Sequence, residues 1–387
     1  MRIFCVLPGS PNAAIASSLW RRNLHDPLVE MGHDTVLWDG GIQPIYDLDP
    51  GATATESVRA RFGAAFAAAA EAAHRERPLD LILTYVSDSH LAPDVIDDVR
   101  ARVAPITNFF CNNIHQFHLV RRTAPHFSAC LVPEAEAIGA YREAGANPIF
   151  FPMAANPTVY RPIETPFVYD ASFAGQRYGD RTAAVLALNE AGIATHAFGP
   201  GWNAATGGGP AGAETGGTFA RVMRIASAAR QGRDPRLALA DWQAWTRLRQ
   251  RHAAILHAPV ADEAYVALFS QSRISLGFLT LSDTHRTERP LRQVRLREFE
   301  GPMSGAFYMT GWIDELARHY EIGREIVCYR SHEEMVDLAR HYLAHADERE
   351  RIRRAGRERA LRDHTWAKRF TDLFRELRAI GVLRADA

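Results

Sequence analysis

The chain has no excess of charge of either sign, because its 45 Lys and Arg residues equal its 45 Asp and Glu residues. A protein that holds nucleic acid by bulk charge needs a basic excess, so the balance argues against that class, although a local basic groove is compatible with it. Cysteine is scarce: Cys5, Cys111, Cys130 and Cys328 are scattered and form no C-x-x-C pair. The sequence therefore predicts neither a zinc ribbon nor a disulfide framework, and it favours a reducing, cytoplasmic environment.

Several catalytic and cofactor motifs are absent as well. The loop at residues 8–12 lacks G-x-G-x-x-G, which counts against a nicotinamide or flavin cofactor at the usual place. Neither G-x-S-x-G nor H-E-x-x-H occurs. The apolar run of residues 3–7 ends at Pro8-Gly9 and is too short for a signal-peptide core or a membrane span. We therefore expect no cofactor and no transmembrane segment.

What the chain does have is an ordinary globular composition and a regular alternation of strands and helices. Of its 387 residues, 47% are apolar and 23% charged, and the length allows two or three domains. Apolar strands that alternate with helices indicate a doubly wound α/β domain, with a parallel sheet covered on both faces and right-handed crossovers. In residues 1–157 we predict strands at 2–7, 33–38, 79–85, 106–110, 128–132 and 148–151, and helices at 13–31, 52–75, 94–102 and 134–144.

A second α/β domain is predicted at residues 158–365, after a proline-containing linker near 156–162. The segment 203–257 interrupts its alternation, because it is first glycine-rich and then helical and rich in Arg and Ala. We interpret this segment as an insertion that forms a lid, or a homodimer contact through residues 219–257. We predict strands at 169–175, 194–198, 274–278 and 325–329, helices at 181–191 and 261–270, and a helical tail at 332–380.

The most informative segment is Arg297–Ala306. It places Glu298 and Glu300 directly before Gly301-Pro302, a pair that predicts a helix start after Glu300. A carboxylate accepts short hydrogen bonds from the vicinal hydroxyls of a sugar or ribose, and the free N–H groups of a helix start can hold phosphate. The alternative is that Glu300 only caps the following helix.

Five segments of the chain follow one another in a recognisable order. They are Tyr169–Arg181, with D-x-x-F-x-G before an Arg; Phe198–Trp202; Arg297–Gly305, with R-x-F-E-x-x-x-x-G; Glu325–Glu334; and Ala355–Arg359 with His364–Trp366. Together they resemble the spore-maturation (CgeB-type) glycosyltransferases of the GT-B superfamily, over roughly residues 105–375. The resemblance implies two Rossmann-like domains facing a cleft, with the acceptor on the side of residues 1–157 and the nucleotide sugar on the side of residues 158–365. It also implies a last helix, at 366–387, that crosses back to pack on the first domain.

The resemblance also implies a donor site. In the resembling family the Glu of R-x-F-E, here Glu300, contacts ribose or sugar hydroxyls. Glycines let the backbone approach a diphosphate, and arginines neutralise the departing nucleotide in place of a metal ion. Many GT-B enzymes that retain the anomeric configuration carry a further glutamate eight positions earlier, where this chain has Arg292, so the sugar and the stereochemistry stay open, with Glu288 and Glu298 as alternatives. The predicted donor-binding residues are Gly175, Arg177, Arg181, Gly199, Arg297, Glu298, Gly301, Ser304 and Gly305, and Glu300 is predicted as catalytic.

The predicted arginines have a second interpretation. Arg181 also suits the first turn of a solvated helix. Three arginines stand within six residues, Arg292, Arg295 and Arg297, and one of them can join the donor site, although a solvated face is the commoner explanation of such a cluster.

Candidates for the acceptor side lie in loops that follow strands of the first domain, where α/β folds bind ligands. His115 is a candidate base for an acceptor hydroxyl, with His118 and Asp88 as further contacts, although a single His is more often structural. The D-x-D of residues 47–49 is the kind of pair that holds a metal on a sugar diphosphate, but its Pro/Gly-flanked position favours a turn.

From these residues we predict a metal-independent glycosyltransferase that moves a sugar from a nucleoside diphosphate sugar, UDP-sugar by default, to an unknown acceptor that is a small molecule, a glycan or a protein. Two alternatives remain open. One is a nucleotide-sugar epimerase of the same fold, and the other is an inactive GT-B scaffold for surface or coat assembly.

Overall fold

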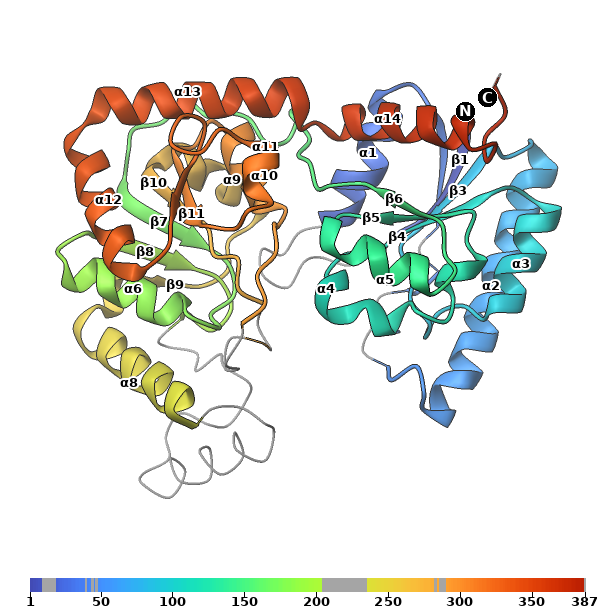
Figure 1. Ribbon diagram of the computed structural model, residues 1–387, viewed down its shortest axis with the longest axis horizontal. Helices are drawn as coiled ribbons and strands as arrows, with labels where there is room; N and C mark the ends of the chain where they lie inside the picture. Colours follow the sequence, from blue (N-terminus) through green and yellow to red (C-terminus); the bar gives the residue numbers. More distant parts are fainter. Residues whose placement is uncertain are drawn as a thin grey trace. The chain divides into compact units, whose positions relative to one another are not determined.

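The structure is a computed structural model (Figure 1) that describes residues 1–8, 19–38, 40–42, 45, 48–203, 235–281, 284 and 290–385. The chain divides into two compact units. The first contains the described residues up to Asn156 and those from His364 onward, and the second runs from Pro157 to Asp363.

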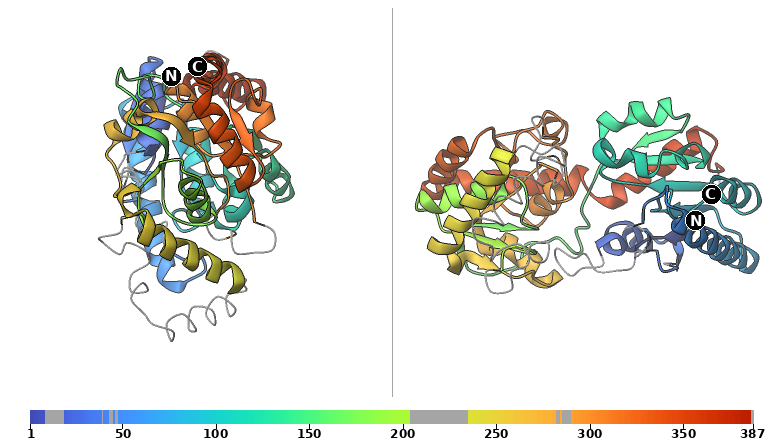
Figure 2. Two further views of the ribbon diagram at one scale, coloured as in Figure 1. Left: turned by 90° about the vertical axis from the view of Figure 1, so that its left-hand side faces the viewer. Right: turned by 90° about the horizontal axis from the view of Figure 1, so that it is seen from below.

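The first unit is built on one parallel sheet with the strand order β2-β1-β3-β4-β5-β6. Helices lie on both faces of this sheet (Figures 1 and 2), so strand residues such as Ile3, Phe4 and Val6 are buried. Each strand predicted for residues 1–157 is present, with ends that differ by one or two residues. The strands are β1 (Arg2–Val6), β2 (Asp34–Trp38), β3 (Leu81–Thr84), β4 (Ile106–Phe109), β5 (Ala129–Val132) and β6 (Pro148–Phe150), and the helices are η1 (Arg21–His25), α1 (Asp26–Glu30), α2 (Thr53–Glu76), α3 (Pro93–Arg102), α4 (Asn113–Gln116), α5 (Ile138–Glu143) and α14 (Trp366–Ala379).

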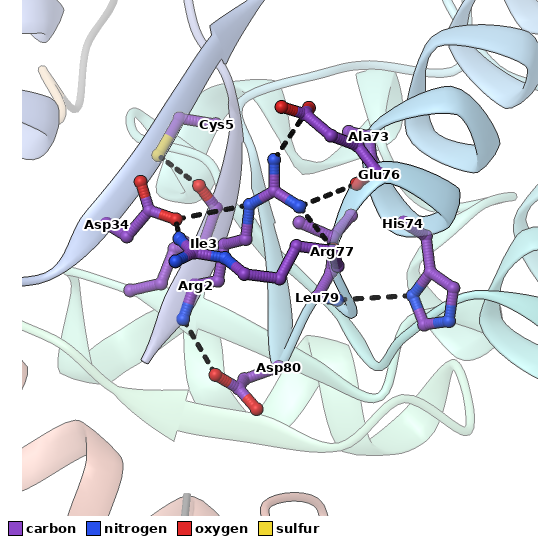
Figure 3. Close-up of polar contacts among 10 residues, drawn as sticks. All are labelled: Arg2, Ile3, Cys5, Asp34, Ala73, His74, Glu76, Arg77, Leu79 and Asp80. Carbon is purple, nitrogen blue, oxygen red and sulfur yellow. Dashed lines mark hydrogen bonds and ion pairs between the residues drawn. The ribbon is translucent and has the colours of Figure 1, made fainter.

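Charged residues join the elements at the amino end of strand β1 (Figure 3). The backbone N–H of Arg2 donates to Asp80 at 2.7 Å, and its guanidinium donates to the Ala73 carbonyl at the end of α2, also at 2.7 Å. The same guanidinium forms ion pairs with Asp34 at 3.1 Å and Glu76 at 3.0 Å. These contacts stabilise the edge of the sheet opposite to the carboxyl ends of the strands.

Helix α14 completes the first unit from the far end of the chain. Trp366 is fully buried, and its Nε1 donates to Asn23 Oδ1 at 2.7 Å. Its ring packs on Phe151 and Phe370, at centroid distances of 5.8 and 6.4 Å. The chain therefore leaves the first unit after Asn156 and returns to it at His364, and in Figure 1 α14 lies beside α1.

The second unit has a parallel sheet of its own, with the order β12-β11-β10-β7-β8-β9. After β7 the chain adds β8 and β9 on one side, and then β10 pairs with the other side of β7. Strands β9 and β11 are additions to the four predicted strands. The strands are β7 (Tyr169–Ala174), β8 (Thr195–Phe198), β9 (Leu256–His257), β10 (Ser272–Leu276), β11 (Tyr308–Gly311) and β12 (Val327–Tyr329), and the helices are α6 (Arg181–Glu190), α8 (Pro235–Arg251), α9 (Asp262–Gln271), α10 (Arg297–Met303), α11 (Leu316–His319), α12 (His332–Ala344) and α13 (Ala346–Asp363).

The predicted insertion at 203–257 is shorter than expected at its end, because the sheet resumes with β9 at Leu256. Residues 204–234 lie outside the described part of the chain. Helix α8 is described, and it packs on the second unit's own core through Trp245 and Leu248, which are 5% and 0% exposed. The homodimer contact through residues 219–257 stays a prediction.

The predicted helix start after Glu300 is wrong. Helix α10 begins at Arg297 and ends at Met303, so Glu300 and Gly301 lie inside it, and Ser304 and Gly305 follow its carboxyl end. Gly301 serves close packing instead, since a Cβ atom there would lie 2.5 Å from the ring of Tyr308 on β11. Because the N–H groups of residues 301–305 do not form a helix start, they do not make the predicted phosphate site.

Candidate functional site

The carboxyl ends of β7 and β10 meet where the strand order of the second sheet reverses. Open parallel sheets bind ligands in the crevice beyond such a point. Gly175 directly follows β7, and a Cβ atom on it would lie 2.8 Å from Nη2 of Arg297. Gly199 follows β8 with φ +133°, and a Cβ atom there would lie 2.5 Å from the Gly175 carbonyl oxygen. Both predicted glycines therefore allow close approach of backbone and arginine at this crevice.

Three arginines gather at this crevice and are called the arginine cluster below: Arg181, Arg295 and Arg297. Arg181 is 2% exposed; its guanidinium donates to the Gln176 carbonyl at 2.6 Å and to the Tyr178 hydroxyl at 2.7 Å. Burial, together with the charges of Arg295 and Arg297, lowers the pKa of Arg181 to about 9. These hydrogen bonds join Arg181 to the loop between β7 and α6. Because Arg181 is buried, it does not lie on a solvated helix face.

The other two members of the arginine cluster are half-buried and come from the entry to α10. The guanidinium of Arg297 lies 5.4 Å from the ring centroid of Phe173, and Nη2 of Arg295 donates to the Thr280 carbonyl at 3.2 Å. Positive charge is therefore concentrated beyond β7 and β10, which suits an anionic ligand.

Arg177 does not join the arginine cluster. Its Nε donates to the Gly201 carbonyl at 3.0 Å, its guanidinium lies 4.3 Å from the ring centroid of Trp245, and Nη1 lies 4.0 Å from Asp241 Oδ2. These partners turn Arg177 toward helix α8. The sequence grouped it with Arg181 because the two are close along the chain, whereas the loop sends them in different directions.

Both predicted glutamates are buried, Glu298 completely and Glu300 to 2% exposure. Glu300 accepts a hydrogen bond from the Tyr265 hydroxyl at 2.7 Å. Burial raises the pKa of Glu300, while hydrogen bonds from Tyr160 and Tyr265 and the charge of Arg297 offset part of the rise. Glu300 therefore faces two tyrosines of its own unit. It lies inside helix α10 and not, as was predicted, directly before a helix start.

Glu298 joins helix α10 to strand β11. Its Oε1 accepts from the Tyr308 hydroxyl at 3.0 Å and the Thr310 hydroxyl at 3.2 Å, and its Oε2 accepts from the backbone N–H of Arg295 at 2.8 Å. Burial raises the pKa of Glu298. The contact with Arg295 makes Glu298 a positioning residue for the arginine cluster.

A pocket of about 270 Å³ opens at the carboxyl ends of β10, β11 and β12, and is called the edge pocket below. No motif in the sequence predicted this pocket, although Arg292 departs from the family pattern. Most of the lining residues stand at or just after the carboxyl end of a strand, and this position in the sequence is the signal that could have identified them. The lining consists of residues 278–280 after β10, Gly311 on β11, Tyr329 with residues 330–332 after β12, Asp180 and Arg292.

In the first unit, the candidate Asp88 has a structural role. Its carboxylate accepts from the backbone N–H groups of Arg122 and Thr123, both at 3.0 Å, and from the Thr123 hydroxyl at 2.7 Å. With 4% of its surface exposed, Asp88 holds the loop at residues 120–124.

His115 lies in α4, directly after Asn112, whose φ of +64° is left-handed. His118 is exposed in the turn that follows. The structure places both beyond the carboxyl end of β4, as predicted.

Glu134 holds the start of this loop and was not among the predicted residues. The Glu134 carboxylate accepts from the backbone N–H of Asn112 at 2.8 Å and from Nδ2 of Asn113 at 2.7 Å.

The remaining acidic candidates are Asp47, Asp49 and Glu288. Asp49 accepts from the backbone N–H of Gly51 at 2.9 Å, which is a turn contact, and Asp47 lies outside the described residues, as does Glu288. In the described ranges, no three His, Cys, Asp or Glu side chains are grouped so that they could hold a metal ion. Among the helices of the same ranges, none is long and apolar enough to span a bilayer.

The two parallel sheets match the fold of the GT-B glycosyltransferases, and the family model that matches the chain is a glycosyltransferase model. The chain belongs to the glycosyl transferase-like family, whose model matches residues 181–375, about half of the chain. No curated protein has a significant sequence match to it.

Solved structures resemble the whole chain. Sucrose-phosphate synthase from Thermosynechococcus elongatus superimposes with a TM-score of 0.60 at 12% identity, and Anabaena Alr3699/HepE in complex with UDP-glucose with 0.58 at 12%. AviGT4, a glycosyltransferase involved in avilamycin A biosynthesis, superimposes with 0.55 at 15%. Each alignment covers 98% of this chain and 99% of the other. At sequence identities this low, the structural similarity shows that these proteins share a fold.

Proposed function

We propose that this glycosyltransferase takes its sugar from a UDP-sugar without the help of a metal ion, and that it is of the CgeB type. The observation that carries the proposal is the arginine cluster beyond β7 and β10, next to the closely packed Gly175 and Gly199. The choice of UDP is supported by the likeness to Alr3699/HepE, whose structure was solved with UDP-glucose.

The arginine cluster suits the charge that sugar transfer creates. When the bond between the anomeric carbon and the diphosphate oxygen breaks, negative charge builds on the departing UDP. Guanidinium groups that are held in place before the reaction stabilise that charge without reorganisation. They replace the metal ion that stabilises the departing diphosphate in metal-dependent glycosyltransferases. In this proposal Arg297 and Arg295 contact the diphosphate, and Arg181 positions the loop.

The buried carboxylates act through the arginines in this proposal. Glu298 accepts a hydrogen bond from the backbone N–H of Arg295. Glu300 lies close to Arg297, whose positive charge offsets part of the rise that burial causes in the pKa of Glu300. His115 is the proposed base that takes the proton of the acceptor hydroxyl, and its substitution by Ala should lower kcat more than the affinity for UDP.

The test is a thermal-shift panel of UDP-, GDP-, ADP- and dTDP-sugars, because a ligand that binds only the folded protein raises the melting temperature by mass action. Arg297→Ala should weaken binding of UDP about ten- to a hundredfold, the usual loss for hydrogen bonds to a charged group. Arg297→Lys keeps the positive charge but loses the paired N–H donors of the guanidinium, so its affinity for UDP should lie between those of the unaltered protein and Arg297→Ala. Arg324→Ala is the control, because Arg324 is exposed and pairs with Glu321.

The outcomes separate the alternatives. If no nucleotide raises the melting temperature, the donor site is wrong and the inactive scaffold is favoured. If a UDP-sugar is converted at equal rate with and without any acceptor preparation, the epimerase is favoured. If Arg297→Ala binds UDP as tightly as the unaltered protein, the arginine cluster is not the diphosphate site.

A further inference from the structure

The edge pocket adjoins the arginine cluster. Thr280 lines the pocket, and its carbonyl accepts the hydrogen bond from Arg295 at 3.2 Å. Phe278, also in the lining, packs on Phe173 of β7 with ring centroids 4.8 Å apart. A group joined to a diphosphate at the cluster can therefore extend into the edge pocket.

The size of the edge pocket limits what enters it. Pockets for drug-sized ligands span about 300–1,000 Å³. At about 270 Å³, the edge pocket suits one sugar ring and not a whole nucleotide sugar.

Two arginines, Arg292 and Arg330, line the rim of the edge pocket. Arg292 pairs with Thr280 in an antiparallel bridge, next to which the Leu281 N–H donates to the Leu291 carbonyl at 2.9 Å. Arg330 follows β12, and its guanidinium lies 4.0 Å from the ring centroid of Trp312, which restricts its movement. Neither guanidinium has an ion pair within the described part of the chain. Guanidinium groups bind carboxylates through paired hydrogen bonds.

The other side of the edge pocket offers a hydrogen-bond acceptor. Asp180 comes from the loop after β7, with two strands between it and the β12 side that carries Arg330. Its Oδ1 is buried and accepts no hydrogen bond from the described residues. A buried carboxylate oxygen needs a donor, and a ring hydroxyl supplies one.

We propose that the edge pocket binds the sugar of the donor and selects a sugar that carries a carboxylate, a uronic acid. Its hydroxyls donate to Asp180, and its carboxylate pairs with Arg292 and Arg330. A neutral hexose satisfies Asp180 but offers neither guanidinium group an ion-pair partner. This inference rests on the proposed function, because the diphosphate of the same donor occupies the arginine cluster.

The test compares the affinities of UDP, UDP-glucose and UDP-glucuronate by calorimetry. The unaltered protein should bind UDP-glucuronate about ten- to a hundredfold more tightly than UDP-glucose, and added salt should reduce the preference. Arg292→Gln and Arg330→Gln should each reduce the preference and leave the affinity for UDP unchanged. Both side chains are exposed, so the variants should fold. Arg351→Gln is the matched control, because Arg351 is an exposed arginine on α13 outside the pocket.

The results distinguish the two proposals. If UDP binds but the acidic and neutral sugars bind equally, or if the preference survives both substitutions, the selection for a uronic acid is wrong while the proposed function stands. If GDP binds in place of UDP, the choice of UDP in the proposed function is wrong, and equal binding of GDP-mannose and GDP-mannuronate would then overturn the selection for a uronic acid. If no nucleotide binds, the proposed function fails and the inference fails with it.

Discussion

At the scale of single residues, several glycines of the second unit are required by close packing. Gly301 faces the ring of Tyr308, and Gly356 on α13 is so close to the Glu325 carbonyl that an added Cβ atom would lie 2.3 Å from its oxygen. Gly301 was predicted to bind a ligand because Gly301-Pro302 predicted a helix start after Glu300. The structure assigns it to the contact between α10 and β11.

Substitution of Gly356 by Ala should lower the free energy of unfolding of the second unit by about 1–3 kcal/mol, because backbone must move to admit the methyl group. Gly139→Ala is the matched control: Gly139 also lies in a helix, α5, with no atom within 4 Å of the added Cβ. It should stabilise the first unit by about 0.5–1 kcal/mol. Urea denaturation measures both, and an unchanged midpoint for Gly356→Ala would contradict the close approach.

At the scale of elements, the loop after β4 is held in a strained shape. Asn112 has a left-handed φ, and such strain persists only where surrounding contacts enforce it. Glu134 accepts from Asn112 and Asn113, and the Tyr141 hydroxyl donates to Asn113 Oδ1 at 2.7 Å. Because the next residues carry His115, these contacts position the proposed base.

Glu134→Gln should destabilise the first unit by about 1.5–3 kcal/mol, because an amide N–H₂ group would face N–H donors in place of a carboxylate oxygen. Hydrogen exchange at residues 110–118 should become faster. Glu136→Gln, at an exposed position two residues away, is the control and should change neither quantity. Unchanged exchange in Glu134→Gln would show that the loop holds its shape without the carboxylate.

At the scale of the whole molecule, two units with separate cores should respond differently to pH. His90 is fully buried in the first unit, bonded to Ser87 and to the Ile42 carbonyl. Burial lowers its pKa from 6.5 to about 4, although its hydrogen bonds to the backbone raise it in part. Between these two values the unfolded chain binds a proton that the folded unit does not.

The free energy of unfolding of the first unit should therefore fall by up to about 3 kcal/mol as the pH drops from 6.5 to 4, at about 1.4 kcal/mol for each pKa unit. The contribution is fully present above pH 6.5. His90→Gln removes the titrating group, so its stability relative to the unaltered protein should improve as the pH falls. Denaturation curves at pH 7.5, 6 and 5 measure this; a difference between the two proteins that stays constant with pH would refute it.

The strands and the α/β class could be predicted because a buried parallel strand is rich in apolar residues, as in the continuous run of residues 3–7 and, interrupted by Ser275 and Gly277, in residues 274–278. The two missed strands show the limit of that signal. Strand β9 has only two residues, and β11, Tyr308–Gly311, has only four and ends in a glycine. Arg297 could be named from its motif, but its contact with Gly175 joins residues more than 100 positions apart.

The sequence by itself determined the α/β fold class and the membership among GT-B glycosyltransferases, because these depend on local periodicity and on motifs within short segments. Only the tertiary structure decided the direction of each side chain: Arg177 toward α8, Glu300 toward Tyr265, Arg295 toward the Thr280 carbonyl and Arg297 toward Gly175 after β7. It also assembled the edge pocket, whose residues come from 180 to 332 in the chain. The physical reason is that parallel strands bring their carboxyl ends to one edge of the sheet, so residues far apart in sequence become neighbours there.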